Sequence, residues 1–223
     1  MKNICVLIPA YNEEKTLGRL LKQLLNRHLS VFVIDDGSTD GTARIAQDSG
    51  ACLLKNEKNS GKGLSLKKGI DHLLNETGCE HILIMDGDMQ HDPGDIDKFI
   101  TAASRGEDCV VGNRMHNPEG MPWLRIMTNK LMSWLISVIT GQKIPDTQCG
   151  YRLFKKDLLS KLDIRTENFQ IETEMLIQAA ARGAAITSVP VASIYHKDSS
   201  SKINPIIDTV RFVKYILTVN GKG

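Results

Sequence analysis

The sequence lacks the features that mark secreted, zinc-binding and membrane-spanning proteins. Its five cysteines are odd in number and include no CxxC pair, which argues against a disulfide framework or a zinc site and favours a reducing compartment. The N-terminus has too short an apolar run, and acidic residues too early, for a signal peptide. The longest apolar stretch, residues 131–142, falls well short of the roughly 20 residues of a membrane span. We therefore expect a soluble or peripheral protein.

The sequence also lacks an excess of charge of one sign. Lysine and arginine (28) nearly balance aspartate and glutamate (26), so the net charge of +2 argues against binding of nucleic acid by bulk charge. With 41% hydrophobic residues, the 223-residue chain has the composition of an ordinary globular protein. It contains no internal repeat and no obvious linker, and we therefore predict one domain over residues 1–223.

Five short apolar runs in the first 112 residues predict β-strands, with helical patterns between them. Because these runs are continuous and do not alternate with polar residues, they suit a sheet that is covered on both faces. The predicted fold class is α/β, with a mainly parallel, Rossmann-like central sheet flanked by helices on both faces. The predicted strands are Ile4–Ile8, Val31–Ile34, Cys52–Leu54, Ile82–Met85 and Cys109–Val111.

Polar segments follow three of these strands, and the strongest of them is Asp-Gly-Asp-Met-Gln at residues 86–90. Ligands of such sheets bind beyond the carboxyl ends of the strands, so we expect the chemistry at this edge. Asp86 and Asp88 point the same way from an extended backbone, and Gly87 lets a phosphate approach. Hard oxygen ligands in this arrangement suit Mg²⁺ or Mn²⁺ shared with substrate phosphates. Asp92, directly before a proline, is predicted to cap the next helix.

Two further segments offer groups that bind a nucleotide. Asp35 and Asp36 end the second strand, where carboxylates can bind ribose hydroxyls or base nitrogens, while residues 38–42 read as a turn and helix cap. The glycine-rich segment 59–63 lacks the spacing of a Walker A loop. Lys62 within it stands at a helix N-terminus and can still face a diphosphate. A G-x-G-x-x-G after the first strand is missing, which disfavours a dinucleotide oxidoreductase.

Residues 121–141 predict one strongly apolar helix that starts near Pro122. A helix of this kind either packs in the core or lies in a membrane interface, with Trp123 and Trp134 at headgroup depth. A second amphipathic pattern, at residues 206–217, suits docking on the domain or on lipid. A narrow polar stripe on the first helix consists of Arg125, Asn129, Ser133 and Ser137.

Six motifs follow one another along most of the chain: Pro-Ala-Tyr-Asn-Glu-Glu (9–14), Ile-Asp-Asp-Gly-Ser (34–38), Met-Asp-Gly-Asp-Met-Gln (85–90), Gly-Asn-Arg (112–114), Asp-Thr-Gln-Cys-Gly-Tyr-Arg (146–152) and Ser-Lys (201–202). In this order and spacing they resemble the family 2 glycosyltransferases of the GT-A fold, and most of all the polyprenyl-phosphate type typified by dolichyl-phosphate mannose synthase. The resemblance implies a nucleotide-sugar half, about residues 1–114, and an acceptor half, about residues 115–223.

The resemblance also implies roles for individual residues on the donor side. In the family, the first motif and the acid that ends the second strand hold the nucleotide, and the end of the fourth strand addresses the diphosphate and the metal. The implied metal ligands are Asp86, Asp88 and Gln90. Together with Lys62 from its helix position, the implied nucleotide-sugar ligands are Pro9, Tyr11, Glu13, Ile34, Asp36, Asp86, Gly87, Asp88, His196 and Lys202. His196 departs from the family pattern, since it stands where the mannose synthases have an arginine.

On the acceptor side, the resemblance implies that Arg114, Arg125 and Arg152 bind the acceptor phosphate. A lipid phosphate is itself a nucleophile at neutral pH, so no strong base is then needed. A hydroxyl acceptor needs a base, and Asp146 is the best candidate. The residues expected to take part directly in catalysis are Asp86, Asp88, Arg114 and Asp146.

The implied reaction is the inverting, metal-dependent transfer of a sugar from a UDP- or GDP-linked donor to a polyprenyl phosphate of the dolichyl or undecaprenyl type. A saccharide or other hydroxyl acceptor stays open, as does a nucleotide-sugar-binding module without turnover. We expect a cytoplasmic protein in peripheral contact with the cytoplasmic face of a membrane. A separate partner that anchors it there also stays open.

Overall fold

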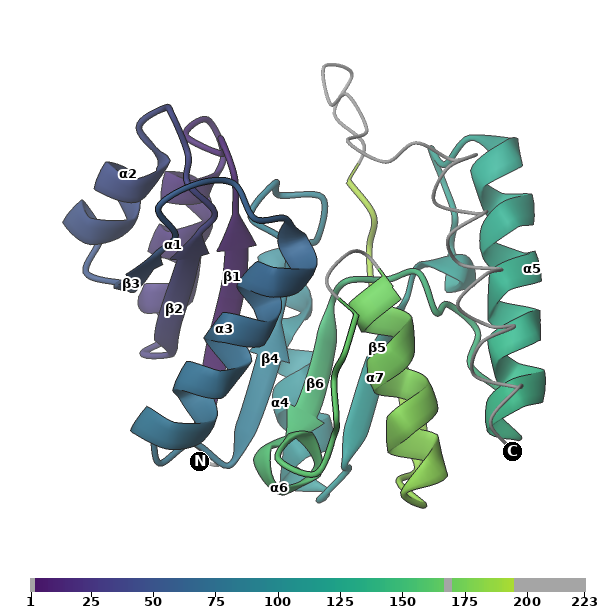
Figure 1. Ribbon diagram of the computed structural model, residues 1–223. Helices are drawn as coiled ribbons and strands as arrows, with labels where there is room; N and C mark the ends of the chain where they lie inside the picture. The colour runs from purple at the N-terminus through teal and green to yellow at the C-terminus, as the bar shows by residue number, and fades with distance from the viewer. Residues whose placement is uncertain (1–2, 167–169, 195–223) are drawn as a thin grey trace.

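The computed structural model describes residues 3–166 and 170–194 and is built on one seven-stranded sheet (Figure 1). The strand order is β3-β2-β1-β4-β6-β5-β7. The five strands predicted from the sequence are all present. The strands are β1 (Ile4–Ala10), β2 (Ser30–Asp35), β3 (Cys52–Lys55), β4 (His81–Ile84), β5 (Cys109–Asn113), β6 (Arg152–Lys155) and β7 (Ile186–Pro190).

The sheet is mainly parallel, as predicted, with one antiparallel strand inserted. β6 runs antiparallel to β4 on one side and to β5 on the other, whereas the other neighbouring strands run parallel. β6 and β7 were not among the strands predicted from the sequence. Neither has a continuous apolar run, because β6 begins and ends with a charged residue and β7 contains two consecutive polar residues, Thr187 and Ser188.

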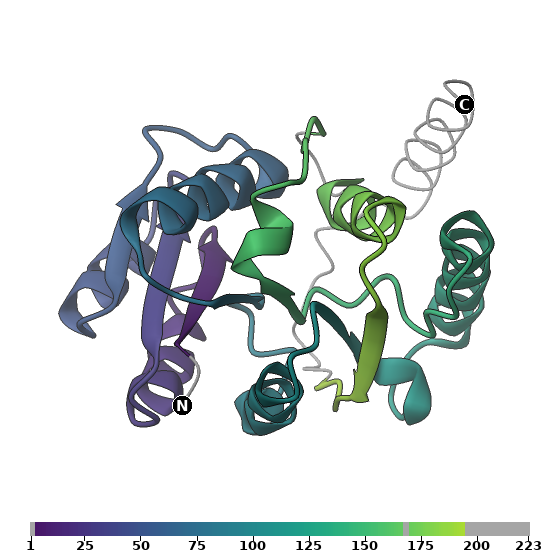
Figure 2. The ribbon, with the colours of Figure 1, turned by 90° about the horizontal axis from the view of Figure 1, so that it is seen from below.

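Helices cover both faces of the sheet, which confirms the predicted α/β class. α3 and α7 lie on one face, and α1 and α4 lie on the other (Figures 1 and 2). The helices are α1 (Leu17–Leu25), α2 (Thr42–Asp48), α3 (Lys62–Glu76), α4 (Ile96–Ser104), α5 (Trp123–Thr140), α6 (Lys156–Leu159) and α7 (Gln170–Ala181), with 3-10 turns η1 (Pro93–Asp95) and η2 (Arg114–His116).

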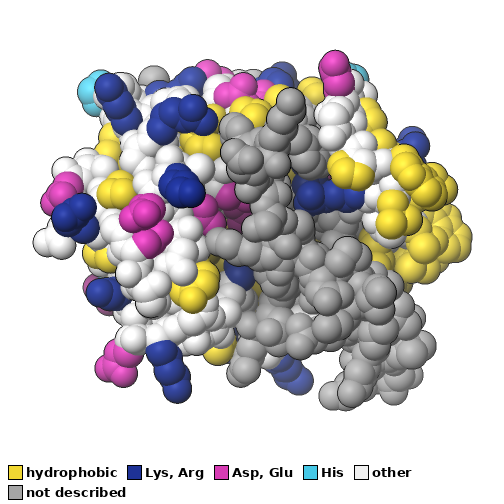
Figure 3. Space-filling view, turned by 90° about the horizontal axis from the view of Figure 1, so that it is seen from above, with side chains coloured by type: hydrophobic (Ala, Val, Ile, Leu, Met, Phe, Trp, Pro, Cys, Tyr) yellow, Lys and Arg dark blue, Asp and Glu magenta, His cyan; other side chains and the backbone are white. Residues whose placement is uncertain are grey.

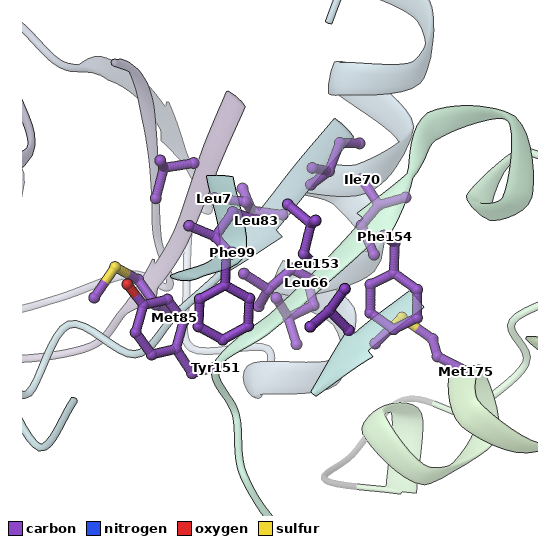
Figure 4. Close-up of a cluster of buried hydrophobic side chains, with 14 of the residues drawn as sticks. Leu7, Leu66, Ile70, Leu83, Met85, Phe99, Tyr151, Leu153, Phe154 and Met175 are labelled. Carbon is purple, nitrogen blue, oxygen red and sulfur yellow. The ribbon is translucent and has the colours of Figure 1, made fainter. Parts of the chain in front are cut away.

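The core lies between the sheet and these two helical layers. Every residue of β1 and of β4 is buried, as expected for strands covered on both faces. α3 approaches β1 so closely that a Cβ atom at Gly69 would come within 2.6 Å of Leu7 Cδ1. Figure 4 shows part of this core, including Leu7, Leu66, Ile70, Leu83, Met85, Phe99, Tyr151, Leu153, Phe154 and Met175.

α5 stands at the side of the molecule, where it packs against α7 (Figure 1). Its polar stripe faces inward: Ser133 Oγ accepts a hydrogen bond from the main-chain N of Thr147, at 2.9 Å. Its apolar face is exposed, which excludes the core alternative for these side chains. The exposed residues are Trp123, Leu124, Met127, Leu131, Trp134 and Val138. None of the helices in residues 3–166 and 170–194 is both long enough and apolar enough to cross a bilayer.

Candidate active site

The carboxyl ends of β1, β2 and β4 meet at one edge of the sheet, as the sequence predicted. Ala10, the last residue of β1, pairs with Asp35, the last residue of β2. On the other side of β1, Leu7 pairs with Ile84, so the segment after β4 runs beside the end of β1. Figure 3 looks onto this edge. The polar loops that follow the three strands are thereby brought together.

The loop after β1, which carries the first motif, is fastened on two sides. The main-chain N of Glu13 donates to Thr42 Oγ1 at 2.8 Å, and that of Asn12 donates to Ser38 Oγ at 2.9 Å. Thr16 Oγ1 donates to the carbonyl oxygen of Gly87 at 2.9 Å, which ties the start of α1 to the loop after β4. Glu13 and the neighbouring Tyr11 are half-buried at this junction. The predicted turn at residues 38–42 thus also supports the first loop.

Asp86 lies in a cluster of charged side chains drawn from three parts of the chain. Lys62 Nζ, at the start of α3, is 2.6 Å from Asp86 Oδ1 and 2.8 Å from Glu172 Oε1, in the first turn of α7. His91 Nε2 is 3.6 Å from Asp86 Oδ2. The ammonium of Lys62 therefore joins the loop after β4 to α7.

Burial alone would raise the pKa of Asp86, but the charge of Lys62 and the contacts with His91 outweigh it and hold the pKa well below its usual range. The pKa of Lys62 is raised in turn, because the carboxylates of Asp86 and Glu172 more than offset its burial. Asp86 is thus ionised, and Lys62 protonated, throughout the physiological range of pH.

Gly150, in the fifth motif, lies against the same carboxylate. A Cβ atom at this position would come within 2.6 Å of Asp86 Oδ2 and 3.3 Å of Glu172 Oε1. Cβ atoms essentially never come as close as 2.6 Å to a heavy atom of a residue that is distant in the chain. A glycine is therefore needed here for Asp86 to keep its place beside Lys62.

Asp88 and Gln90 complete the segment predicted to hold a metal. Burial, followed by the charge of Asp86, raises the pKa of Asp88, while its Oδ1 accepts a hydrogen bond from the main-chain N of Gln90 at 2.9 Å. Two carboxylates that disfavour each other's charge, together with an amide oxygen, form a donor set that fits a hard divalent cation. Within residues 3–166 and 170–194 there is no cluster of three or more acidic, histidine or cysteine side chains suited to a metal. Mg²⁺ commonly needs only one or two carboxylates when substrate phosphates supply further oxygens, so the residues fit this ion.

A buried ion pair, Arg114–Asp146, lies where β5 ends. Arg114 Nε is 2.8 Å from Asp146 Oδ2, and Arg114 Nη2 is 2.9 Å from Asp146 Oδ1. The Asp146 side chain is fully buried, and that of Arg114 is 6% exposed. Burial would raise the pKa of Asp146, but the hydrogen bonds and charge of Arg114 lower it overall. Both carboxylate oxygens are occupied and the group is a weak base, which is unfavourable for the predicted role as a general base.

Comparison with known proteins identifies the family. The model of glycosyl transferase family 2 matches residues 5–163. This chain belongs to glycosyltransferase family 2. It is 32% identical to glycosyltransferase AglJ of Haloferax volcanii, over 92% of this chain and 68% of that protein. It is 29% identical to the UDP-N-acetylglucosamine–dolichyl-phosphate N-acetylglucosaminyltransferase of Methanococcus voltae, over 99% of this chain and 98% of that protein.

The fold of this family 2 glycosyltransferase is GT-A, as predicted. Its backbone resembles the crystal structure of glucosyl-3-phosphoglycerate synthase from Mycobacterium tuberculosis in complex with Mn²⁺, uridine diphosphate and phosphoglyceric acid, with a TM-score of 0.73. The two sequences are 19% identical, and the match covers 97% of this chain and 76% of the other.

The position of Asp36 in the glycosyltransferase changes the interpretation of its role. Its carboxylate is buried and accepts four hydrogen bonds: from the main-chain N of Ser60 and of Gly61, from Ser65 Oγ and from Asn56 Nδ2, all at 2.8–2.9 Å. These contacts hold the loop that leads into α3. Asp36 is thus a residue that shapes the site, and its oxygens are not directed at a nucleotide as the sequence analysis expected.

Two other predicted ligands of the glycosyltransferase lie in the interior. The Ile34 side chain packs in the core, and Ile34 pairs with Pro9 in the sheet, so it offers a nucleotide no side-chain contact. Arg152 is fully buried: its Nε donates to the carbonyl of Cys149, and its Nη2 to the carbonyl of Thr147, each at 2.7 Å. The prediction that Arg152 binds the acceptor phosphate is therefore wrong in this structure, because the guanidinium is used to fix the fifth motif.

Two residues of the charged cluster, Glu172 and His91, were not predicted from the sequence. Glu172 lies near the start of a helix, where an acidic side chain usually interacts only with the helix dipole, and nothing in the pattern indicates that it reaches Lys62. His91 directly follows the motif at the end of the fourth strand, and this position in the sequence could have indicated that it lies near Asp86. The predicted ligands His196 and Lys202, and the amphipathic pattern at 206–217, lie outside the described residues.

Proposed function

We propose that this family 2 glycosyltransferase transfers a sugar from a UDP- or GDP-linked donor to a polyprenyl phosphate, with inversion and with Mg²⁺ or Mn²⁺. The observation that carries the proposal is the pair of carboxylates, Asp86 and Asp88, at the end of β4. The comparisons support it: one similar enzyme is named for a UDP-sugar and dolichyl phosphate, and the structural neighbour was crystallised with Mn²⁺ and uridine diphosphate.

The donor half of the proposal, about residues 1–114, uses the edge formed by β1, β2 and β4. Asp86, Asp88 and Gln90 would hold the cation, which when bound supplies the positive charge that stabilises the departing diphosphate. Glu13, which lies beside Gly87, and Tyr11 in the same loop would border the nucleotide. Lys62 adds a cation that the chain itself provides.

The acceptor half of the proposal, about residues 115–223, uses the Arg114–Asp146 pair. Both carboxylate oxygens of Asp146 accept hydrogen bonds from Arg114. An acceptor substrate that needs no general base from the protein therefore fits this site better than a hydroxyl acceptor does. A phosphate monoester meets this requirement, because it is largely dianionic at neutral pH. Arg114, oriented by Asp146, and Arg125, one turn before Asn129 on the polar stripe of α5, would receive the phosphate.

The acceptor is tested by following a radiolabelled sugar. We expect UDP- or GDP-sugar, Mn²⁺ and a polyprenyl phosphate to yield a label that extracts into butanol and is released by mild acid. Omission of the lipid or addition of EDTA should abolish it. Label found only in water-soluble saccharide would reject the lipid acceptor and leave the hydroxyl acceptor, and the absence of transfer from any nucleotide sugar would reject turnover.

The exposed face of α5 is proposed to contact the membrane that contains the acceptor. In Figure 3 hydrophobic side chains gather on the side of the molecule where α5 lies. Trp123 and Trp134 are 74% and 61% exposed, near opposite ends of this face, and tryptophan prefers the headgroup region of a bilayer.

Replacing both tryptophans by serine should lower the bound fraction on phosphatidylcholine–phosphatidylglycerol vesicles at least about fivefold in a flotation assay. Transfer to a short, water-soluble prenyl phosphate is the control and should stay within about twofold of the wild type. Unchanged flotation of the double variant would contradict membrane contact through α5.

A further inference from the structure

The position of the Lys62 ammonium has a consequence for cation binding. It contacts Asp86 Oδ1 at 2.6 Å, while His91 Nε2 lies 3.6 Å from Asp86 Oδ2 and Gly150 approaches that oxygen so closely that not even a Cβ atom would fit there. A cation that takes Oδ1 of Asp86 must therefore displace the ammonium or share the oxygen with it. Two cations cannot share one carboxylate oxygen closely without strong mutual repulsion.

Glu172 provides the ammonium with a second carboxylate. Its Oε1 is 2.8 Å from Lys62 Nζ, and the Glu172 and Lys62 side chains are only 13% and 18% exposed, so solvent screens the attraction weakly. Lys62 can therefore release Asp86 and keep an anionic partner. Without Glu172, release of Asp86 would take both of these carboxylates away from a largely buried ammonium, which is unfavourable.

The place of Glu172 is fixed by the interior. Arg152 Nη2 lies 3.8 Å from Glu172 Oε2, and Arg152 Nη1 donates to the Glu172 carbonyl oxygen. Arg152 is itself held by the carbonyl groups of Thr147 and Cys149. The buried arginine thus connects the fifth motif to the first turn of α7 and holds the carboxylate toward Lys62.

We propose that Lys62 and the divalent cation compete for Asp86, and that Glu172 is a positioning residue that retains Lys62 when Asp86 turns to the metal. This inference rests on the proposed use of a metal at Asp86 and Asp88. In this scheme Glu172 influences the binding of the metal through Lys62 and is not itself a ligand of the metal.

The competition predicts changes of opposite sign in Mn²⁺ affinity, measured without nucleotide by the electron paramagnetic resonance of free Mn²⁺. Lys62→Gln removes the competing charge and should tighten Mn²⁺ binding about tenfold. Glu172→Gln removes the second carboxylate from Lys62, so that Lys62 is held more firmly by Asp86, and should weaken Mn²⁺ binding about fivefold. Lys62→Arg keeps the charge and should stay within about twofold of the wild type, as should Lys22→Gln, which removes a charge from the exposed side of α1.

The outcomes separate this inference from the proposed function. If the wild type binds no Mn²⁺ that Asp88→Asn abolishes, the proposed metal site fails and the inference fails with it. If the wild type binds Mn²⁺ but Lys62→Gln leaves the affinity unchanged or weaker, the competition alone is overturned. Weakening by both Lys62→Gln and Glu172→Gln, with a lowered Tm, would show that the two residues merely support the fold.

Discussion

Replacing Asp88 by asparagine is expected to lower kcat/KM for sugar transfer by at least about 10³-fold, the scale on which charge stabilisation of a leaving group contributes to catalysis. The substitution keeps the size of the side chain and removes its charge. The pKa of Asp88 is already raised by burial and by Asp86, so a neutral side chain suits this position in the folded protein. We therefore expect the thermal stability to be unchanged or higher while the activity is lost. Steady-state kinetics and the thermal melting curve measure the two effects.

Asp92→Asn is the matched control for this experiment. Asp92 lies four residues further along the same loop and, as predicted, caps η1 by accepting a hydrogen bond from the main-chain N of Gly94 at 2.8 Å. Asparagine also serves as a helix cap, so this variant should retain activity within about threefold. Equal losses in both variants would contradict a specific role for the Asp88 charge.

Replacing Asp146 by alanine is expected to lower the free energy of unfolding by about 3–5 kcal/mol, because it leaves the buried guanidinium of Arg114 without its carboxylate. The main-chain N of Arg114 and of Gln148 also donate to Asp146, at 3.1 and 3.2 Å, and these bonds are lost with it. Urea denaturation measures the change. A loss below about 1 kcal/mol would be typical of an exposed pair and would contradict the buried geometry.

A double replacement separates the charge from the packing. Arg114→Met combined with Asp146→Leu removes both charges from the interior, and it should recover much of the stability that Asp146→Ala loses. Transfer activity should not recover, since the proposed phosphate ligand is absent. Recovery of both properties would argue that Arg114 has only a structural role.

The same pair predicts how stability depends on pH. The pKa of Asp146 is lowered in the folded protein, so its contribution is present above the pKa of an unfolded aspartate, about 3.9. That contribution is lost as the pH falls through the lowered folded-state pKa. The wild type should therefore lose stability on acidification below about pH 4, and the Asp146→Ala variant should lack this part of the loss.

Much of the architecture was readable because local rules determine it. Continuous apolar runs predicted β1 to β5, and the order of elements predicted a mainly parallel sheet with a polar carboxyl edge. The cap at Asp92 also followed from its position before Pro93. β6 and β7 escaped prediction, because β6 has a short sequence bounded by Arg152 and Lys155 and is recognisable as a strand only once its neighbours are placed.

The roles of individual charged residues were less predictable. The sequence predicted functional roles for Asp36, Arg152 and Asp146. It does not reveal how many hydrogen-bond donors or acceptors the fold places around each of these three side chains. Asp36 accepts hydrogen bonds from main-chain N–H groups, and Arg152 donates hydrogen bonds to carbonyl groups. These contacts give both side chains a structural role. Glu172 is the opposite case: the sequence predicted no role for it, but the packing of α7 brings its carboxylate to Lys62.

The sequence by itself determined the family, the α/β fold class and the segment, residues 86–90, that carries the paired carboxylates. The order of the motifs along the chain and the spacing of the apolar residues can be read directly from neighbouring residues, so they do not depend on the tertiary structure. Only the tertiary structure decided which face of α5 meets solvent, which anions share Lys62, and that Asp146 is paired with Arg114. Those outcomes depend on distances between residues that are far apart in the chain, and burial strengthens their electrostatic interactions by excluding water.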